Sequence, residues 1–167
     1  GTTALHAIYV AAGLQEGDEI ILSPLTFCAT SNAALWEGVK PVFVDVDPKT
    51  GNIDPNKIES AITPKTKAIV SIDYTGRPVE YEAIAQIAKK HGLLHISDGC
   101  HALGARYAGQ PVGMQAAMTA FSFHPVKAIT TGEGGAVVTN NEAYYKKMKQ
   151  FATHGITATE LTVTSPG

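Results

Sequence analysis

The chain has few cysteines: its 167 residues include only two, Cys28 and Cys100. Two cysteines so far apart form neither a disulfide framework nor a paired-cysteine metal site, so we expect a protein of the reducing cytoplasm with no bound metal. Long apolar runs are also missing. No stretch approaches the roughly 20 apolar residues that a membrane helix needs, and no secretory leader is recognisable, so we expect no membrane association.

Strong charge of either sign is absent as well. The formal net charge is −2, and the densest basic run is Lys146–Lys149, which reads as the solvated face of a helix. This balance argues against a nucleic-acid-binding protein. Hydrophobic residues make up 44% of the chain and charged residues 17%, enough apolar side chains to fill the core of one domain.

Strand-like apolar runs alternate with helical patterns along the chain. The strand-like runs cover residues 19–22, 42–46, 67–72, 93–97, 118–122 and 135–139. The helical patterns cover residues 3–12, 28–37, 57–62, 80–90 and 142–152. Continuous rather than alternating apolarity indicates strands that are buried on both faces. We therefore predict an α/β fold with a mostly parallel, mixed sheet sandwiched by helices, in which one of the last two strands runs antiparallel.

Both ends of the chain look cut. Gly1-Thr2-Thr3 leads directly into a helical pattern with no strand before it, and residues 162–167 end in turn-forming residues. We expect residues 1–167 to be a single domain taken from a longer protein.

Several candidate site residues lie at the ends of strand-like runs, where open α/β sheets bind their ligands. Phe27, Asp98, Ser122 and Lys127 each come shortly after such a run. The threonines of Gly1-Thr2-Thr3 stand at a helix N-terminus, where free N–H groups and the helix dipole favour a phosphate. The sequence therefore predicts one crevice in which these segments converge.

Lys127 and Asp98 suggest the chemistry of that crevice. Lys127 closes the run Ser-Phe-His-Pro-Val-Lys and precedes Thr-Thr-Gly-Glu-Gly-Gly at 130–135, while Asp98 lies in Ile-Ser-Asp-Gly-Cys-His. A strand-end lysine and a strand-end acid suit a pyridoxal phosphate enzyme. The amine forms a Schiff base with the cofactor aldehyde, and the carboxylate keeps the pyridine nitrogen protonated.

With these motifs, nearly the whole chain resembles the DegT/StrS family of sugar-nucleotide aminotransferases. The Ser-Phe-x-x-x-Lys motif followed by Thr-Gly-Glu-Gly-Gly is the most specific part of the match. The resemblance implies the large, cofactor-binding domain of the aspartate-aminotransferase fold (fold type I), lacking the segment before Gly1 and the small domain after Gly167. His124-Pro125 points to the pseudaminic acid branch of the family, and Lys127 argues against the dehydratase branch, which has histidine there.

The resemblance also assigns roles to individual residues. It makes Lys127 the Schiff-base lysine, Asp98 the partner of the pyridine nitrogen and Phe27 the aromatic that stacks on the ring. The remaining cofactor contacts that it implies are His101 beside the ring, and Ser122, Thr2 and Thr3 at the phosphate.

The implied reaction transfers an amino group from glutamate to a keto-sugar nucleotide, a UDP-4-keto-6-deoxy sugar by the branch resembled. The implied reaction is a step in the biosynthesis of surface polysaccharides or flagellin sugars. The implied assembly is a homodimer whose partner subunits complete each other's active sites.

Structural explanations compete with these roles. Asp98 could cap the turn that follows it, Thr2 could be a plain helix N-cap, and Phe27, His101 and Ser122 could belong to the core. His91 and His95 have helical metal-ligand spacing, but Gly92 should end the helix between them.

Two other functions stay open at this point. One is a non-catalytic relative that keeps the fold as a regulatory or sugar-binding module. The other is a different fold type I enzyme, such as a lyase or a decarboxylase. An intact Lys127 with Asp98 disfavours the first, and the Ser-Phe-x-x-x-Lys spacing disfavours the second.

Overall fold

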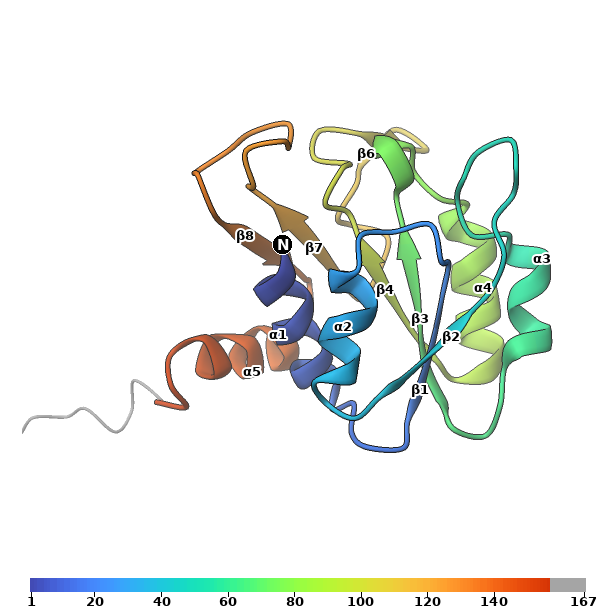
Figure 1. Ribbon diagram of the computed structural model, residues 1–167, viewed down its shortest axis with the longest axis horizontal. Coiled ribbons are helices and arrows are strands. Elements are labelled where there is room, and N and C mark those ends of the chain that lie inside the picture. The colour runs from blue at the N-terminus through green and yellow to red at the C-terminus, as the bar shows by residue number, and fades with distance from the viewer. Residues whose placement is uncertain (157–167) are drawn as a thin grey trace, which may run out of the picture.

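Six strands form one sheet in the order β2-β1-β3-β4-β7-β8 (Figure 1). The computed structural model describes residues 1–156. Neighbouring strands from β2 to β7 are parallel, whereas β8 runs antiparallel to β7 with Thr119 opposite Val138. The strands are β1 (Glu19–Leu22), β2 (Lys40–Phe43), β3 (Thr66–Ile72), β4 (Leu94–Asp98), β7 (Met118–Ser122) and β8 (Gly135–Val138).

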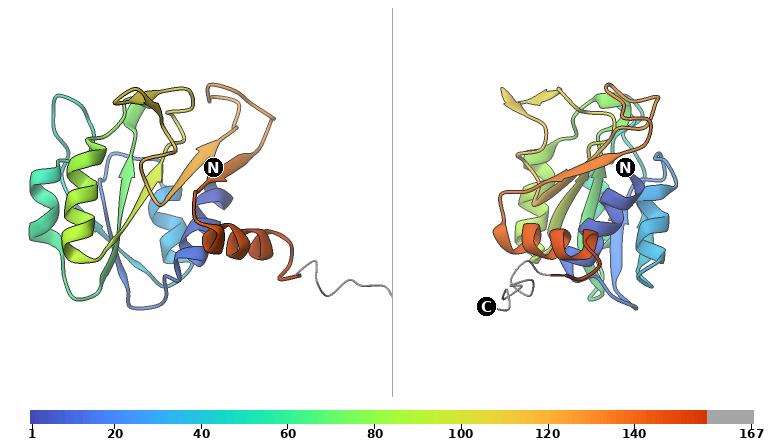
Figure 2. Two further views of the ribbon diagram at one scale, coloured as in Figure 1. Left: turned by 180° about the vertical axis from the view of Figure 1, so that it is seen from behind. Right: turned by 90° about the vertical axis from the view of Figure 1, so that its left-hand side faces the viewer.

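Helices cover both faces of this sheet. The helices are α1 (Thr2–Ala12), α2 (Ala29–Leu35), α3 (Pro55–Ile58), α4 (Tyr81–His91) and α5 (Glu142–Ala152). Figure 2 shows α1 and α2 on one face and α3 and α4 on the other, and α5 packs against α1. Single 3-10 turns extend α3 (η1, Glu59–Ala61) and follow β3 (η2, Tyr74–Gly76). The predicted α/β sandwich with an antiparallel last strand is confirmed.

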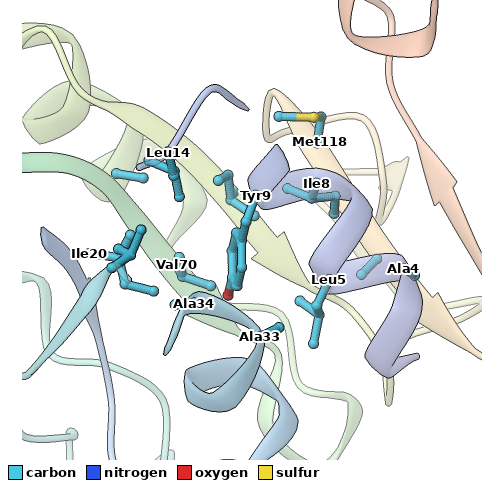
Figure 3. Packing of buried hydrophobic residues seen from close by; sticks show 14 of the residues in the cluster. Ala4, Leu5, Ile8, Tyr9, Leu14, Ile20, Ala33, Ala34, Val70 and Met118 are labelled. Carbon is cyan, nitrogen blue, oxygen red and sulfur yellow. The ribbon is translucent and has the colours of Figure 1, made fainter. Parts of the chain in front are cut away.

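Two apolar cores lie on opposite faces of the sheet. The first packs α1 and α2 against the strands, and in it Tyr9 extends from α1 toward Ala33 and Ala34 of α2 (Figure 3). The second packs α4 against the other face, around Ile69 and Ile84. Burial on both faces explains why the strands lack an alternating pattern.

Most element bounds match the sequence expectation, and the exceptions have local causes. β2 ends at Phe43 because the chain then turns: Val46 N–H donates to its neighbour Asp45 Oδ1 at 2.9 Å, and Val46 forms an isolated bridge with Ile53. α2 is shorter than residues 28–37 because residues 36–38 form a turn. Residues 162–167 lie outside the described part of the chain.

Glycine ends two of the helices. Gly13 after α1 and Gly92 after α4 have φ of 73° and 66°, in the left-handed region that favours glycine. Asp54 begins α3, where its side chain accepts a hydrogen bond from Asn56 N–H. At these three positions the local sequence determines where a helix begins or ends, and tertiary contacts do not override it.

A buried polar layer lies on the α4 side of the sheet. The Asp73 carboxylate accepts hydrogen bonds from Tyr81 Oη (2.6 Å), Val79 N (2.9 Å) and Ser97 Oγ (3.2 Å). Burial raises the pKa of Asp73 to about 6. On β4, His95 is also buried, and burial lowers its pKa to about 4.

These two groups should oppose each other in the pH dependence of stability. As pH rises between about 4 and 6, folded Asp73 holds a proton that the unfolded chain has released, so its contribution to the free energy of unfolding falls. Buried His95 stays neutral while the unfolded imidazole binds a proton, so its contribution rises with pH up to about 6.5. In Asp73→Asn, only the rise due to His95 should remain. Between about pH 4 and 6, the free energy of unfolding should therefore change by about 3 kcal/mol relative to the wild type.

Urea unfolding at several pH values between 4 and 7 measures this change. The exposed Glu16 offers a matched control, and Glu16→Gln should give a curve parallel to the wild type. An Asp73→Asn curve that also runs parallel would show that the buried carboxylate has an ordinary pKa.

Candidate active site

A cavity of about 240 Å³ opens at the carboxyl ends of the central strands, beside the N-terminus of α1. Figure 1 shows that the start of α1 and the loops after β4 and β7 lie at this same end of the sheet. Six of the predicted site residues line the cavity: Thr2, Phe27, Asp98, His101, Ser122 and Lys127. Thr3 does not line it, although it belongs to the first turn of α1. The predicted convergence of separate segments is therefore found, for all but one residue.

Asp98 lies against the cavity with little access to solvent. The residue is 5% exposed. Its carboxylate accepts two hydrogen bonds, at Oδ2 from Thr30 Oγ1 (2.7 Å) and at Oδ1 from Cys100 N–H (3.2 Å). Within residues 1–156, no Lys, Arg or His pairs with it. A buried carboxylate needs a compensating positive charge, and the cavity is the open direction from which a cationic ligand group can supply one.

Glycine lets the start of α1 approach the strands closely. A Cβ on Gly1 would lie 2.9 Å from Ser122 Cβ and 3.2 Å from Cys100 Sγ, and a Cβ on Gly135 would lie 2.7 Å from Gly1 N. Gly1 also occupies the N-cap position, so Thr2 is not the helix cap. The free N–H groups of the first turn thus lie close to the buried Ser122 hydroxyl, an arrangement that suits a phosphate.

Lys127 lies in the loop between β7 and β8. Its backbone N–H donates to His124 O at 2.9 Å, and its side chain is half-buried at the cavity. Phe123 closes the loop, since its N–H donates to Gly134 O and its carbonyl accepts from Thr131 N–H, both at 3.0 Å. The glycine-rich segment is therefore a connection between β7 and β8 that holds the loop carrying Lys127.

The two aromatic candidates are not core residues. Phe27 is 69% exposed, and His101 is also exposed while lining the cavity. Partial burial, and then the positive charge of Lys127, lower the pKa of His101. The imidazole is therefore neutral at pH 7 and can lie beside a ligand ring without adding charge.

Other residues at or near the cavity were not predicted as site residues from the sequence, and Tyr74, Cys100 and Thr30 are the most informative of them. Tyr74 lines the cavity directly after β3, and the strand-end rule that selected Asp98 would also have found it. Cys100 lines the cavity as well, and burial followed by the charge of Asp98 raises the pKa of its thiol. Thr30 lies behind the cavity on α2, and no sequence signal marks its contact with Asp98 across 68 positions.

The histidines with helical spacing have separate partners. His91 Nε2 lies 2.8 Å from Glu59 Oε1, and His95 Nε2 lies 2.9 Å from Ser71 Oγ. Among residues 1–156, no group of three or more His, Cys, Asp or Glu side chains has the arrangement of a metal site. In the same part of the chain, no helix combines the length and apolarity that crossing a bilayer requires.

Known proteins share part of this sequence and its fold. The chain is 48% identical over 157 residues to the UDP-4-amino-4,6-dideoxy-N-acetyl-beta-L-altrosamine transaminase of Helicobacter pylori, covering 93% of this chain and 42% of that protein. It is 42% identical over 156 residues to the GDP-perosamine synthase of Caulobacter vibrioides, with coverage of 93% and 42%. The crystal structure of NtdA from Bacillus subtilis with bound cofactor PMP matches with a TM-score of 0.89 and 39% identity, over 98% of this chain and 36% of that one.

The chain therefore spans less than half the length of these relatives. The profile of the DegT/DnrJ/EryC1/StrS aminotransferase family matches residues 1–165. The sequence identity, the shared fold and this match together show that the chain belongs to the DegT/DnrJ/EryC1/StrS aminotransferase family.

Proposed function

We propose that the chain is the cofactor-binding large domain of a longer pyridoxal-phosphate-dependent aminotransferase. The observation that supports this best is the pair of side chains at the cavity. Asp98 is a buried carboxylate without a cationic partner in residues 1–156, and Lys127 is a half-buried amine on the loop after the next strand of the sheet. Membership of an aminotransferase family and a similar structure with bound PMP support the same proposal.

The residues around the cavity fit this cofactor. Asp98 would hold the proton of the ring nitrogen, Ser122 and the first turn of α1 would hold the phosphate, and Phe27 and His101 would lie beside the ring. These contacts would fix the depth and the plane of the ring, so that the Lys127 amine meets a defined carbon atom. When bound, pyridoxal phosphate supplies an aldehyde that amines attack and a ring that accepts an electron pair.

Lys127 would act twice in the reaction. Its amine would hold the cofactor, whose aldehyde is the group that amines attack. As a free amine, Lys127 would also act as the general base that takes the proton from the Cα of the donor, and then as the general acid that gives this proton back. Proton transfer by a positioned group commonly contributes about 10²–10⁴-fold to the rate.

For substrates, we propose glutamate as the amino donor and a UDP-4-keto-6-deoxy sugar as the acceptor. The support is the 48% identity to the altrosamine transaminase and the His124-Pro125 pair in the lysine motif. The GDP-perosamine synthase at 42% identity makes a GDP-linked sugar the natural competitor. We further propose that the enzyme is a homodimer and acts in the cytoplasm in polysaccharide or pseudaminic acid biosynthesis.

The test is an amination assay with the full-length protein that contains this chain. Glutamate would be combined in turn with UDP-linked and GDP-linked 4-keto-6-deoxy sugars and with a 3-keto sugar, and the release of 2-oxoglutarate would be measured. Release that depends on a UDP-linked 4-keto sugar supports the proposal, and release only with another acceptor would correct the substrate. Absence of release with every acceptor, together with no covalent adduct on Lys127 after borohydride reduction in the presence of the cofactor, would contradict the enzyme function.

A further inference from the structure

Thr30 is the central link of a hydrogen-bond chain behind the cavity. It is fully buried in the second position of α2, and its Oγ1 lies 2.7 Å from Asp98 Oδ2 and 2.7 Å from Thr26 Oγ1. Thr26 lines the cavity and Thr30 does not. Thr30 therefore contacts the buried acid without being part of the cavity wall.

The single hydroxyl hydrogen of Thr30 can be assigned from its neighbours. Three oxygens lie within reach: Asp98 Oδ2, Thr26 Oγ1 and, at 3.1 Å, Phe27 O. Phe27 O already accepts from Thr30 N–H at 3.1 Å, and Thr26 can itself donate. An ionised carboxylate can only accept, and it forms the strongest of the three bonds. The proton thus points from Thr30 to Asp98, with Thr26 donating to Thr30 in turn.

The backbone of Thr30 is held as firmly as its side chain. Tyr9 Oη donates to Thr30 O at 2.8 Å from α1, and burial raises the pKa of Tyr9, so this phenol remains a donor. In addition, Thr30 N–H donates to the carbonyl of Phe27, an aromatic residue that lines the cavity. Thr30 therefore connects α1, the loop that carries Phe27, and Asp98 at the end of β4.

We propose that Thr30 is a positioning residue of the cofactor site. Its hydroxyl fixes Oδ2 of Asp98, so that the carboxylate keeps one orientation toward the cavity. The inference rests on the proposed function, because it assigns Thr30 a role toward the same cofactor. It adds a residue that does not touch the cofactor or either substrate.

Three variants test this role in the full-length protein: Thr30→Val, Thr30→Ser and Thr30→Ala. Valine keeps the shape and removes the hydroxyl, whereas serine keeps the hydroxyl and removes the methyl group. A hydrogen bond to a charged group corresponds to about a tenfold to hundredfold change in an equilibrium constant. We expect Thr30→Val to weaken the binding of pyridoxal phosphate to the apoprotein by that factor, and Thr30→Ser to keep wild-type affinity.

Steady-state kinetics and a second threonine separate positioning from simple stability. Thr30→Val should lower kcat and leave the KM for glutamate unchanged, because Thr30 does not reach the substrates. Thr66→Val removes another buried, hydrogen-bonded hydroxyl at the start of β3, far along the strand from the cavity, and should leave cofactor affinity unchanged. Both variants are first compared by urea unfolding.

The outcomes distinguish the two proposals. A wild-type protein that binds no pyridoxal phosphate contradicts the proposed function itself. A wild-type protein that binds the cofactor, with equal affinity in Thr30→Val, overturns the role of Thr30 alone. Equal losses in the valine and serine variants would make Thr30 a packing residue, which also overturns the proposal. Should Thr30→Val fail to fold, the alanine and serine variants decide in the same way.

Discussion

Lys127→Ala is expected to abolish amino-group transfer in the full-length protein. Alanine removes both the amine that would hold the cofactor covalently and the group that would move the Cα proton. The proton transfer alone is worth about 10²–10⁴-fold in kcat, so the measured loss should be at least that large. Steady-state release of 2-oxoglutarate measures the loss. Borohydride reduction followed by peptide mass spectrometry should find a cofactor adduct at Lys127 in the wild type and none in the variant.

The remaining contacts of the cavity should still hold some cofactor in this variant, because Asp98 and Ser122 are unchanged. Lys146→Ala is the matched control. Lys146 forms an exposed ion pair with Glu142 at 2.8 Å on α5, an interaction worth about a few tenths of a kcal/mol. Its activity should equal that of the wild type. Continued turnover in Lys127→Ala at a rate near the wild type would remove Lys127 from the mechanism.

The sequence predicts this site well where strand ends determine position. β7 is found at its predicted bounds because Met118–Ser122 is a largely apolar run of strand length, and the end of this strand places Ser122 and the start of the lysine loop. The same rule predicts the position of Asp98. The observed strand β4 is shifted by one residue, so that it begins at Leu94 and has Asp98 as its last residue. Parallel strands share one carboxyl edge, so a one-dimensional pattern yields a three-dimensional cluster.

The prediction fails where side-chain direction or tertiary contact decides. Thr2 and Thr3 cannot both face the cavity, because consecutive residues of a helix point about 100° apart; only Thr2 lines it. The hairpin of β5 (Arg106–Tyr107) and β6 (Gln110–Pro111) has no apolar run to announce it, and its turn includes Ala108 with φ of 47°. The bond from Thr30 to Asp98 exists only once α2 has packed on the sheet.

Asp98→Asn is the second variant from which a large effect is expected. The amide keeps the size of the side chain but has no charge with which to hold a proton on the ring nitrogen. Loss of a preorganised electrostatic group in an active site commonly lowers kcat by about 10²–10³-fold, and we expect a loss of that order together with weaker cofactor binding. Kinetics and a cofactor titration of the apoprotein measure the two effects.

Asp73→Asn is the control for removing a buried carboxylate as such. Asp73 follows β3 on the neighbouring strand, is fully buried and does not line the cavity. Its replacement should alter the pH dependence of stability and leave kcat near the wild type at pH 7. A loss of activity in Asp73→Asn equal to that in Asp98→Asn would mean that any disturbance of this edge of the sheet lowers activity. The charge of Asp98 would then have no specific role.

Asp98→Asn also decides between the electrostatic role of Asp98 and a role as a turn cap. Asp98 does cap its turn, since Oδ1 accepts from Cys100 N–H at 3.2 Å. Asparagine can form that cap equally well with its one carbonyl oxygen. Its amide nitrogen must then face Thr30, whose hydroxyl can turn toward Phe27 O at 3.1 Å instead. The fold should therefore survive in Asp98→Asn while the charge is lost, so wild-type activity in this variant would leave Asp98 only its structural role.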